Sequence, residues 1–185
     1  MDDPGHDHDA NPEGNPVPKR QDIVRIARQF IGAIPFSRAV GMELREIGEG
    51  WARITMPYSA ELVGEPSTGV IHGGAVSALM DTCGGAAVMS HPTGPVSTAT
   101  IDLRIDYMRA ATPGQTITAE ATCYHVTRSV AFVRAVARDE TGETPVATAS
   151  GAFTLQRATS GRLGARSSGS VENATQNEEH RSAIP

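Results

Sequence analysis

The chain has 185 residues, of which 39% are hydrophobic and 20% charged, and its net charge at pH 7 is −5. Residues 1–19 carry five acids against one base, whereas residues 20–157 are nearly neutral, with 12 Arg against 13 acids. This longer stretch has no surplus of basic residues for a phosphate backbone, which argues against nucleic-acid binding. The sequence contains no apolar run of about 18 residues and no basic-then-apolar N-terminus. We therefore expect a cytoplasmic protein without a membrane partner.

Two tails flank one predicted domain. Residues 1–19 are rich in Pro, Gly and acids, and residues 158–185 are rich in Ser, Gly, Arg, Asn and Glu, so both are predicted to be disordered. The remaining residues 20–157 have the size of a single domain. Histidines and aspartates alternate over residues 6–9, but a tail offers no preorganised ligand geometry, and we expect no metal and no other cofactor.

The first half of the domain predicts a helix and two strands. Apolar residues recur at helical spacing between residues 23 and 34, and Pro35 is expected to end this short helix. Residues 42–47 and 51–56 read as strands around a glycine-containing turn. Residues 61–69 contain proline, serine and glycine and are expected to form a loop.

The second half predicts a buried helix followed by strands. Residues 73–89 are almost wholly apolar, and a helix that is apolar on all sides must be covered by protein. Four strands rich in Thr, Val and Ala follow, separated by turns, at residues 98–108, 116–126, 130–138 and 146–155. Short connections between consecutive strands favour antiparallel pairing. We predict an α+β fold in which about six antiparallel strands surround one long helix.

The predicted buried helix contains one unusual carboxylate. Asp81 is the only charged residue between positions 70 and 89. An ionised, unpaired carboxylate in such surroundings costs several kcal/mol, so its presence needs a reason. Either Asp81 is a functional carboxylate, or it is a structural one satisfied by local hydrogen bonds.

Two glycines and a histidine stand where this helix begins. The N–H groups of Gly73 and Gly74 lack partners within the helix, and without side chains a ligand oxygen can approach them closely. They are therefore either an oxyanion hole or simply a glycine entry to the helix. His72 is either a general base or a histidine that fixes the loop through its ring nitrogens, and we favour the second interpretation.

Several segments together resemble a known family. They are Gly69-Val-Ile-His-Gly-Gly-Ala-Val-Ser-Ala-Leu-Met-Asp-Thr-Cys-Gly, Ile101-Asp-Leu-Arg-Ile-Asp-Tyr-Met-Arg-Ala-Ala and Ala147-Thr-Ala-Ser-Gly-Ala-Phe, with Ile34-Pro-Phe and Gly41 upstream. This pattern resembles the hotdog-fold acyl-CoA thioesterases of the phenylacetate-degradation (PaaI-like) type, over residues 34–155. The resemblance implies a helix wrapped by an antiparallel sheet, and homodimers joined edge to edge, often paired into tetramers.

The resemblance also implies an active site at the dimer interface. Asp81 matches the carboxylate that acts on the thioester as general base or nucleophile, and Gly74 matches the residue whose N–H polarises the thioester carbonyl. Thr100 matches a hydroxyl that we expect from the partner protomer. Many members carry Asn six residues before the histidine, where this chain has Pro66. The neighbouring Glu65 or Ser67 is therefore the expected substitute.

The implied substrate needs cations and leads to a functional expectation. The phosphates of CoA would be bound by arginines near the interface, or these arginines are ordinary surface residues; the candidates are Arg104, Arg109 and Arg128. We expect an enzyme that hydrolyses small aliphatic or aromatic acyl-CoA thioesters. The alternatives are an acyl-CoA-binding hotdog protein without catalysis, which Pro66 favours, and a hotdog hydroxyacyl dehydratase in which His72 and Asp81 would share the proton chemistry.

Overall fold

The computed structural model describes residues 31–142 and 144–157. The two tails, the alternating run at residues 6–9 and most of the predicted first helix lie outside these residues. Pro35 does interrupt the helical backbone, but it also begins a second short helix, α2 (Pro35–Ala39). Proline fits the first helical turn because its missing N–H would have no partner there.

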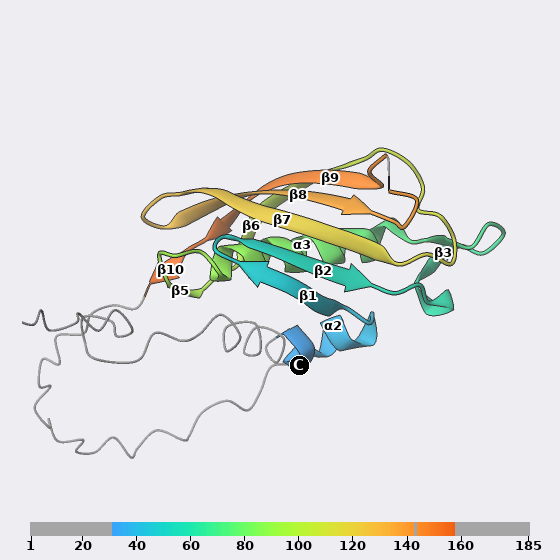
Figure 1. The fold of residues 1–185 in the computed structure, drawn as a ribbon, viewed down its shortest axis with the longest axis horizontal. Helices are drawn as coiled ribbons and strands as arrows, with labels where there is room; N and C mark the ends of the chain where they lie inside the picture. The colour runs from blue at the N-terminus through green and yellow to red at the C-terminus, as the bar shows by residue number, and fades with distance from the viewer. Residues whose placement is uncertain (1–30, 143, 158–185) are drawn as a thin grey trace, which may run out of the picture.

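Six strands form the main sheet, and all of its pairs are antiparallel. Their order is β1-β2-β7-β8-β9-β6 (Figure 1). The bounds are β1 Glu43–Gly48, β2 Trp51–Met56, β6 Thr100–Tyr107, β7 Ile117–Val126, β8 Val130–Arg138 and β9 Ala147–Thr154. The α+β prediction is confirmed, and each predicted main strand is present to within about two residues.

One expected neighbour relation is wrong. Consecutive strands pair in β1–β2, β7–β8 and β8–β9, but β6 pairs with β9 instead of β7. The segment between β6 and β7 crosses the ends of two strands, a distance of about 15 Å at the usual interstrand spacing. Residues 108–116 form this connection, and an extended segment of that many residues is longer than 15 Å. This crossing makes β6 an edge of the sheet.

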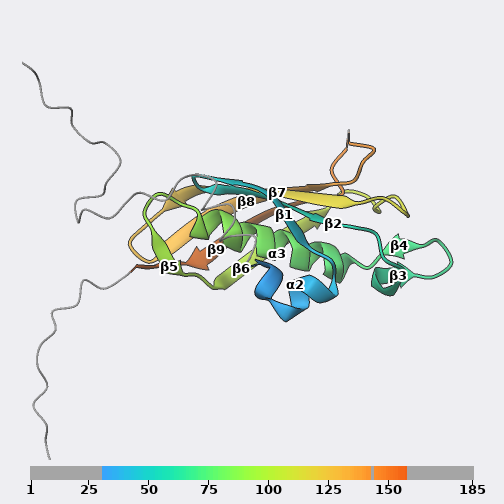
Figure 2. The same cartoon turned by 60° about the horizontal axis from the view of Figure 1, so that its bottom comes forward.

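The long helix α3 (Gly73–Met89) has the predicted bounds and lies along one face of the sheet (Figure 2). Its buried side includes Leu79, Met80 and Cys83. The Cys83 Sγ lies 3.3 Å from the carbonyl oxygens of Ala52 in β2 and Ala119 in β7, which share its single hydrogen, and burial raises the pKa of the thiol to about 12. The opposite side of the helix is only partly buried within one chain. The sequence predicted a helix covered by protein on all sides, and the single chain covers one face of it fully.

Two small sheets flank the main one and were not predicted. β3 (Val63–Glu65) follows a 3-10 turn (Ala60–Leu62) and pairs with β4 (Val70–Ile71), so the expected loop at 61–69 is largely a hairpin. This hairpin lies at the end of the molecule where α3 begins (Figure 2). At the opposite end, β5 (Pro95–Ser97) pairs with β10 (Gln156–Arg157). No helix in the described part of the chain has the length and hydropathy needed to cross a membrane.

Candidate active site

The helix carboxylate and a strand hydroxyl form one pair. Asp81 lies in the middle of α3 and is half-buried, and Thr100 is the first residue of β6. The Thr100 hydroxyl donates to Asp81 Oδ1 at 2.6 Å. Thr100 was expected to come from a partner protomer, but the structure places it against Asp81 of the same chain. The reason is the edge position of β6, whose first residue faces the middle of α3.

His72 caps the beginning of α3. Its side chain stands at the N-cap position, where Nδ1 accepts from the N–H of Gly74 at 2.9 Å. Its own N–H donates to the carbonyl of Leu62, and a Cβ on Gly64 would approach His72 Cα to 2.7 Å. The histidine is thus held between the hairpin and the helix, which favours its loop-fixing role. No carboxylate in the described residues bonds it.

Gly74 and Asp81 face the same side of α3 but lie apart. They are seven positions apart in the chain, which is almost two helical turns and about 10 Å along the axis. The carbonyl of one thioester is too small to reach both groups within one chain. An arrangement in which both act on one carbonyl therefore requires the Gly74 of one copy and the Asp81 of another.

A tyrosine that sequence reasoning missed also contacts this turn. Tyr107, the last residue of β6, donates its hydroxyl to the carbonyl of Gly73 at 2.6 Å. Ser77 Oγ lies 2.7 Å from the same hydroxyl. Tyr107 belongs to the segment on which the family resemblance was based, but a strand tyrosine carries no sequence signal for a contact with a glycine 34 residues earlier.

The predicted substitutes for asparagine are engaged with each other. Glu65 Oε1 accepts from both the N–H and the hydroxyl of Ser67 around Pro66. These bonds, the hydroxyl first, lower the pKa of Glu65. The polar groups of Glu65 and Ser67 in this exposed turn therefore bond each other. Among the described contacts, neither side chain reaches His72 or Asp81.

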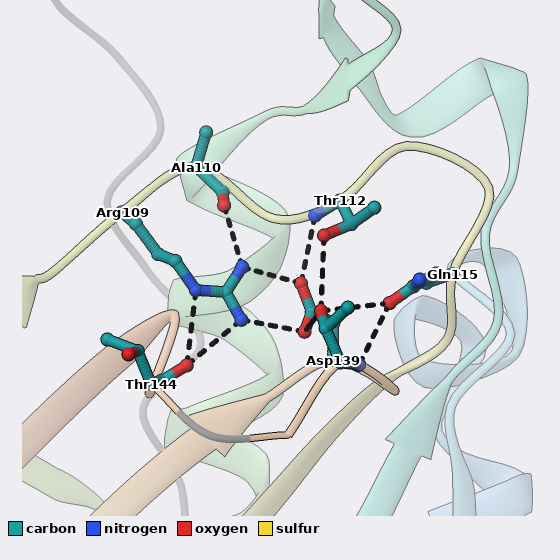
Figure 3. A network of polar contacts seen from close by, with 7 residues as sticks. Arg109, Ala110, Thr112, Gln115, Asp139 and Thr144 are labelled. Atoms are coloured by element: carbon teal, nitrogen blue, oxygen red, sulfur yellow. Dashed lines mark hydrogen bonds and ion pairs between the residues drawn. The ribbon is translucent and has the colours of Figure 1, made fainter.

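One of the three predicted arginines is committed to a structural ion pair (Figure 3). Arg109 donates through both Nη atoms to the two carboxylate oxygens of Asp139 at 2.7 Å, and also to the carbonyls of Ala110 and Thr144. The guanidinium holds the pKa of Asp139 well below its usual range, and the carboxylate raises that of Arg109. Arg109 joins the loops after β6 and β8. Its Nε and both Nη atoms donate to protein oxygens, which leaves no N–H for a CoA phosphate.

The other two arginines remain exposed. Arg104 is in β6, where it contacts Asp106 at 2.9 Å while its side chain stays 80% exposed. Arg128 is in the turn between β7 and β8 and is also exposed. An exposed ion pair such as Arg104–Asp106 is weak, so Arg104 can leave Asp106 to contact an anionic ligand. The exposed Arg128 side chain can contact one as well.

A cavity of about 290 Å³ opens beside the start of α3. Gly73 and Tyr107 line one part of it, and most of the other lining residues are apolar: Val70, Ile71, Val76, Met108, Ala111 and Val146. Arg109 also lines this pocket, but its guanidinium is bound by Asp139, so the pocket suits a hydrocarbon group better than a charged one. Among the His, Cys, Asp and Glu residues that the structure describes, no three gather in a way that would hold a metal ion.

Comparisons with known proteins place this chain in a family. A family model described as "Thioesterase superfamily" matches residues 68–146. A Halobacterium salinarum protein named as an esterase is 33% identical over 124 residues, covering 64% of this chain and 82% of that protein. The medium/long-chain acyl-CoA thioesterase YigI of Escherichia coli is 27% identical over 133 residues, covering 65% of this chain and 85% of YigI.

A solved structure gives the fold. The PaaI protein from the phenylacetic acid degradation operon of E. coli superimposes with a TM-score of 0.64 at 22% identity, covering 74% of this chain and 98% of that one. The long helix on a six-stranded antiparallel sheet is thus a hotdog fold of the PaaI-like type. The chain belongs to the thioesterase superfamily, and the resemblance drawn from the sequence is confirmed.

Proposed function

We propose that this protein hydrolyses acyl-CoA thioesters to a free carboxylic acid and CoA. The observation that carries the proposal is the pair of Asp81 and Thr100. The hydroxyl orients one carboxylate oxygen, and no other described residue donates to Asp81, so the second oxygen is available for chemistry. A partly buried carboxylate with spare acceptor capacity on a conformationally fixed helix suits a general base or a nucleophile.

The reaction balances in either role. As a base, Asp81 takes a proton from water, the water oxygen bonds to the thioester carbon, the C–S bond breaks and the proton passes to the CoA thiolate. As a nucleophile, Asp81 bonds to that carbon itself and the C–S bond breaks to release CoA as its thiolate; water then cleaves the resulting anhydride, which frees the acid and the Asp81 carboxylate, and the proton from water passes to the thiolate. In both, the carbonyl oxygen gains negative charge, and a preorganised N–H at that oxygen is worth about 10²–10³ in rate.

The N–H of Gly74 is the proposed donor to that oxygen. In the structure it bonds His72 Nδ1, so the thioester oxygen replaces the imidazole as acceptor. The His72 side chain is exposed, and in the proposed complex its imidazole leaves the Gly74 N–H so that the thioester oxygen takes its place. Because Gly74 and Asp81 are about 10 Å apart along one helix, the donor comes from a second copy of the chain.

The two edges of the sheet support this dimer. The β1 edge carries charged side chains such as Glu43 and Glu46, which discourage pairing with another strand. β6 carries charged side chains as well, Arg104 among them, but with the residue after it this edge exposes three large apolar side chains, Ile101, Tyr107 and Met108, by about half. Pairing β6 with β6 of a second copy would cover these apolar side chains and continue the sheet.

The cavity and the exposed arginines support an acyl-CoA substrate. The apolar pocket beside Gly73 would take the acyl group, and Arg104 and Arg128 would contact the CoA phosphates. The name of YigI, a medium/long-chain acyl-CoA thioesterase, supports testing longer acyl chains beside short and aromatic ones.

A thiol-release assay tests the proposal. Purified protein is incubated with acetyl-, hexanoyl-, palmitoyl-, benzoyl- and phenylacetyl-CoA, and free CoA is measured with a disulfide dye. We expect turnover of at least one of them, and we expect Asp81→Asn to lower kcat by at least about 100-fold with KM nearly unchanged. Equal turnover by the variant would refute the role of Asp81.

Mixed dimers test the two-copy site. Asp81→Asn removes the carboxylate, and Gly74→Pro removes the N–H within the first helical turn, where no helical bond is lost but the His72 imidazole, 2.9 Å from this nitrogen, must give way to the proline ring. If each site takes one group from each copy, refolding equal amounts of the two inactive variants together restores about a quarter of the wild-type activity, because half of the dimers are mixed and each has one intact site. No recovery would place both groups in one copy.

A ligand-binding protein without catalysis is the second candidate, and Pro66 at the position of the usual asparagine favours it. Binding of acyl-CoA by calorimetry with no thiol release would establish it. The dehydratase alternative has less support, because His72 Nδ1 accepts from a backbone N–H and no described carboxylate bonds the ring.

A further inference from the structure

We propose that Tyr107 is a positioning residue of the thioesterase site, holding the peptide group whose N–H stabilises the oxyanion. The inference rests on the proposed function, since it gives Tyr107 a role in the same reaction. It concerns a side chain that contacts neither Asp81 nor Thr100 among the described contacts.

The argument begins with one planar unit. The carbonyl of Gly73 and the N–H of Gly74 belong to the same peptide group and point in opposite directions. Tyr107 donates to this carbonyl at 2.6 Å, while the N–H at the other side bonds His72 at 2.9 Å. Fixing the carbonyl oxygen therefore fixes the direction in which the N–H points after the imidazole leaves.

The donors in this cluster are ordered. The carbonyl oxygen of Gly73 only accepts, so the single hydroxyl hydrogen of Tyr107 is used there. Ser77 must then donate its own hydroxyl hydrogen to Tyr107 across the 2.7 Å contact. The result is a chain from Ser77 to Tyr107, to the Gly73 carbonyl, and through the peptide to the Gly74 N–H. Each bond in such a chain strengthens the next by polarisation, so the N–H becomes a better donor.

The absence of a side chain at Gly73 allows this contact. A Cβ there would lie 3.2 Å from the Tyr107 hydroxyl oxygen and 3.3 Å from the ring carbon that bears it. Glycine thus lets the strand tyrosine approach the first turn of α3 closely. The tyrosine itself is 49% exposed and lines the apolar cavity, so its hydroxyl lies next to the proposed acyl pocket.

A purely structural role would instead make Tyr107 a tie between β6 and α3. That role predicts a loss of stability with no selective change in the chemical step. The two roles are separated by Tyr107→Phe, which keeps the ring and removes the hydroxyl. The matched control is Tyr124→Phe, the same change at a tyrosine of similar exposure, 52%, in β7, whose ring lies against Arg134 on a different strand.

We expect Tyr107→Phe to lower kcat by about 10-fold, with KM changed less than about twofold and the thermal midpoint close to wild type. Tyr124→Phe is expected to match wild type in kcat. In ¹H–¹⁵N spectra the Gly74 amide proton should move upfield in Tyr107→Phe alone, since its peptide loses the polarising bond. An unchanged kcat in a variant that folds, or an unchanged Gly74 resonance, would overturn the proposal.

Two further results are distinguishable from these. If Tyr107→Phe does not fold, Ser77→Ala replaces it, since it removes only the first bond of the chain; a fall in kcat of about two- to threefold supports the proposal, and no change contradicts it. If wild-type protein releases no CoA from any substrate, the proposed function fails and the role of Tyr107 fails with it.

Discussion

Two carboxylates of this molecule differ in how much of their hydrogen-bonding capacity is used. Asp139 is 5% exposed and accepts two bonds from Arg109, one from the N–H of Thr112 and one from the hydroxyl of Thr141. Asp81 is half-buried and accepts one bond, from Thr100, among the residues described. A saturated carboxylate stays in one charge state and one position, whereas an unsaturated one can accept a proton or attack. Spare hydrogen-bonding capacity, rather than depth of burial, is therefore the property on which the proposed role of Asp81 depends.

Replacing Asp139 is expected to have the largest effect, and that effect is on the stability of the fold. Asp139→Asn leaves the partly buried Arg109 guanidinium without its counter-ion, which should lower the free energy of unfolding by about 3 kcal/mol. Urea denaturation measures this, and kcat of the folded variant should stay near wild type. Asp81→Asn is expected to show the opposite pattern. A large fall in kcat for Asp139→Asn at unchanged stability would break the comparison.

The pH dependence of stability follows from the lowered pKa of Asp139. The unfolded carboxylate takes up a proton near pH 4, but the folded one stays ionised well below that. Stability from this pair is fully present above pH 4 and falls with decreasing pH, by at most about 1.4 kcal/mol per unit. Between pH 4 and pH 2, wild type should therefore lose more stability than Asp139→Asn does in parallel denaturations. Parallel curves for the two proteins would contradict the assignment.

The long helix and the pair of Asp81 and Thr100 were predictable from local signals in the sequence. The helix at residues 73–89 was placed correctly because its almost wholly apolar run begins at a glycine pair and is too long for a strand. Asp81 stood out because it is the only charge in that run, and Thr100 followed from the family motif. Both signals are local to one element or one motif.

The partners of Arg109 and Tyr107 were not predicted because they depend on distant chain segments. Arg109 contacts Asp139, 30 residues later, because β6 is the edge strand beside β9 and the loops after β6 and β8 therefore lie side by side. Tyr107 meets Gly73 only because the first turn of α3 lies beside the end of β6. Side-chain spacing within one element carries no information about such contacts.

Removing Thr100, the one donor to Asp81 among the residues that the structure describes, should have a smaller effect, and on catalysis alone. Thr100→Val keeps a β-branched side chain at the start of β6 and deletes the hydroxyl that orients the carboxylate. We expect kcat to fall about 10-fold with the midpoint of urea denaturation nearly unchanged. Thr100→Ser, which retains the hydroxyl, is the control and should recover most of the activity. Equal kcat for valine and serine would show that the hydroxyl does not orient Asp81.

The corresponding change at the saturated carboxylate should have the smallest effect. Thr141→Val removes one donor from Asp139, but Arg109 and the N–H of Thr112 still hold the carboxylate. The free energy of unfolding should fall by about 1 kcal/mol, the usual value of one hydrogen bond, with kcat unchanged. Thr141→Ser should restore the stability. Because Asp81 and Asp139 each lose one hydroxyl in the two valine variants, the readout that responds, kcat in one and unfolding in the other, identifies which carboxylate does chemistry and which joins two loops.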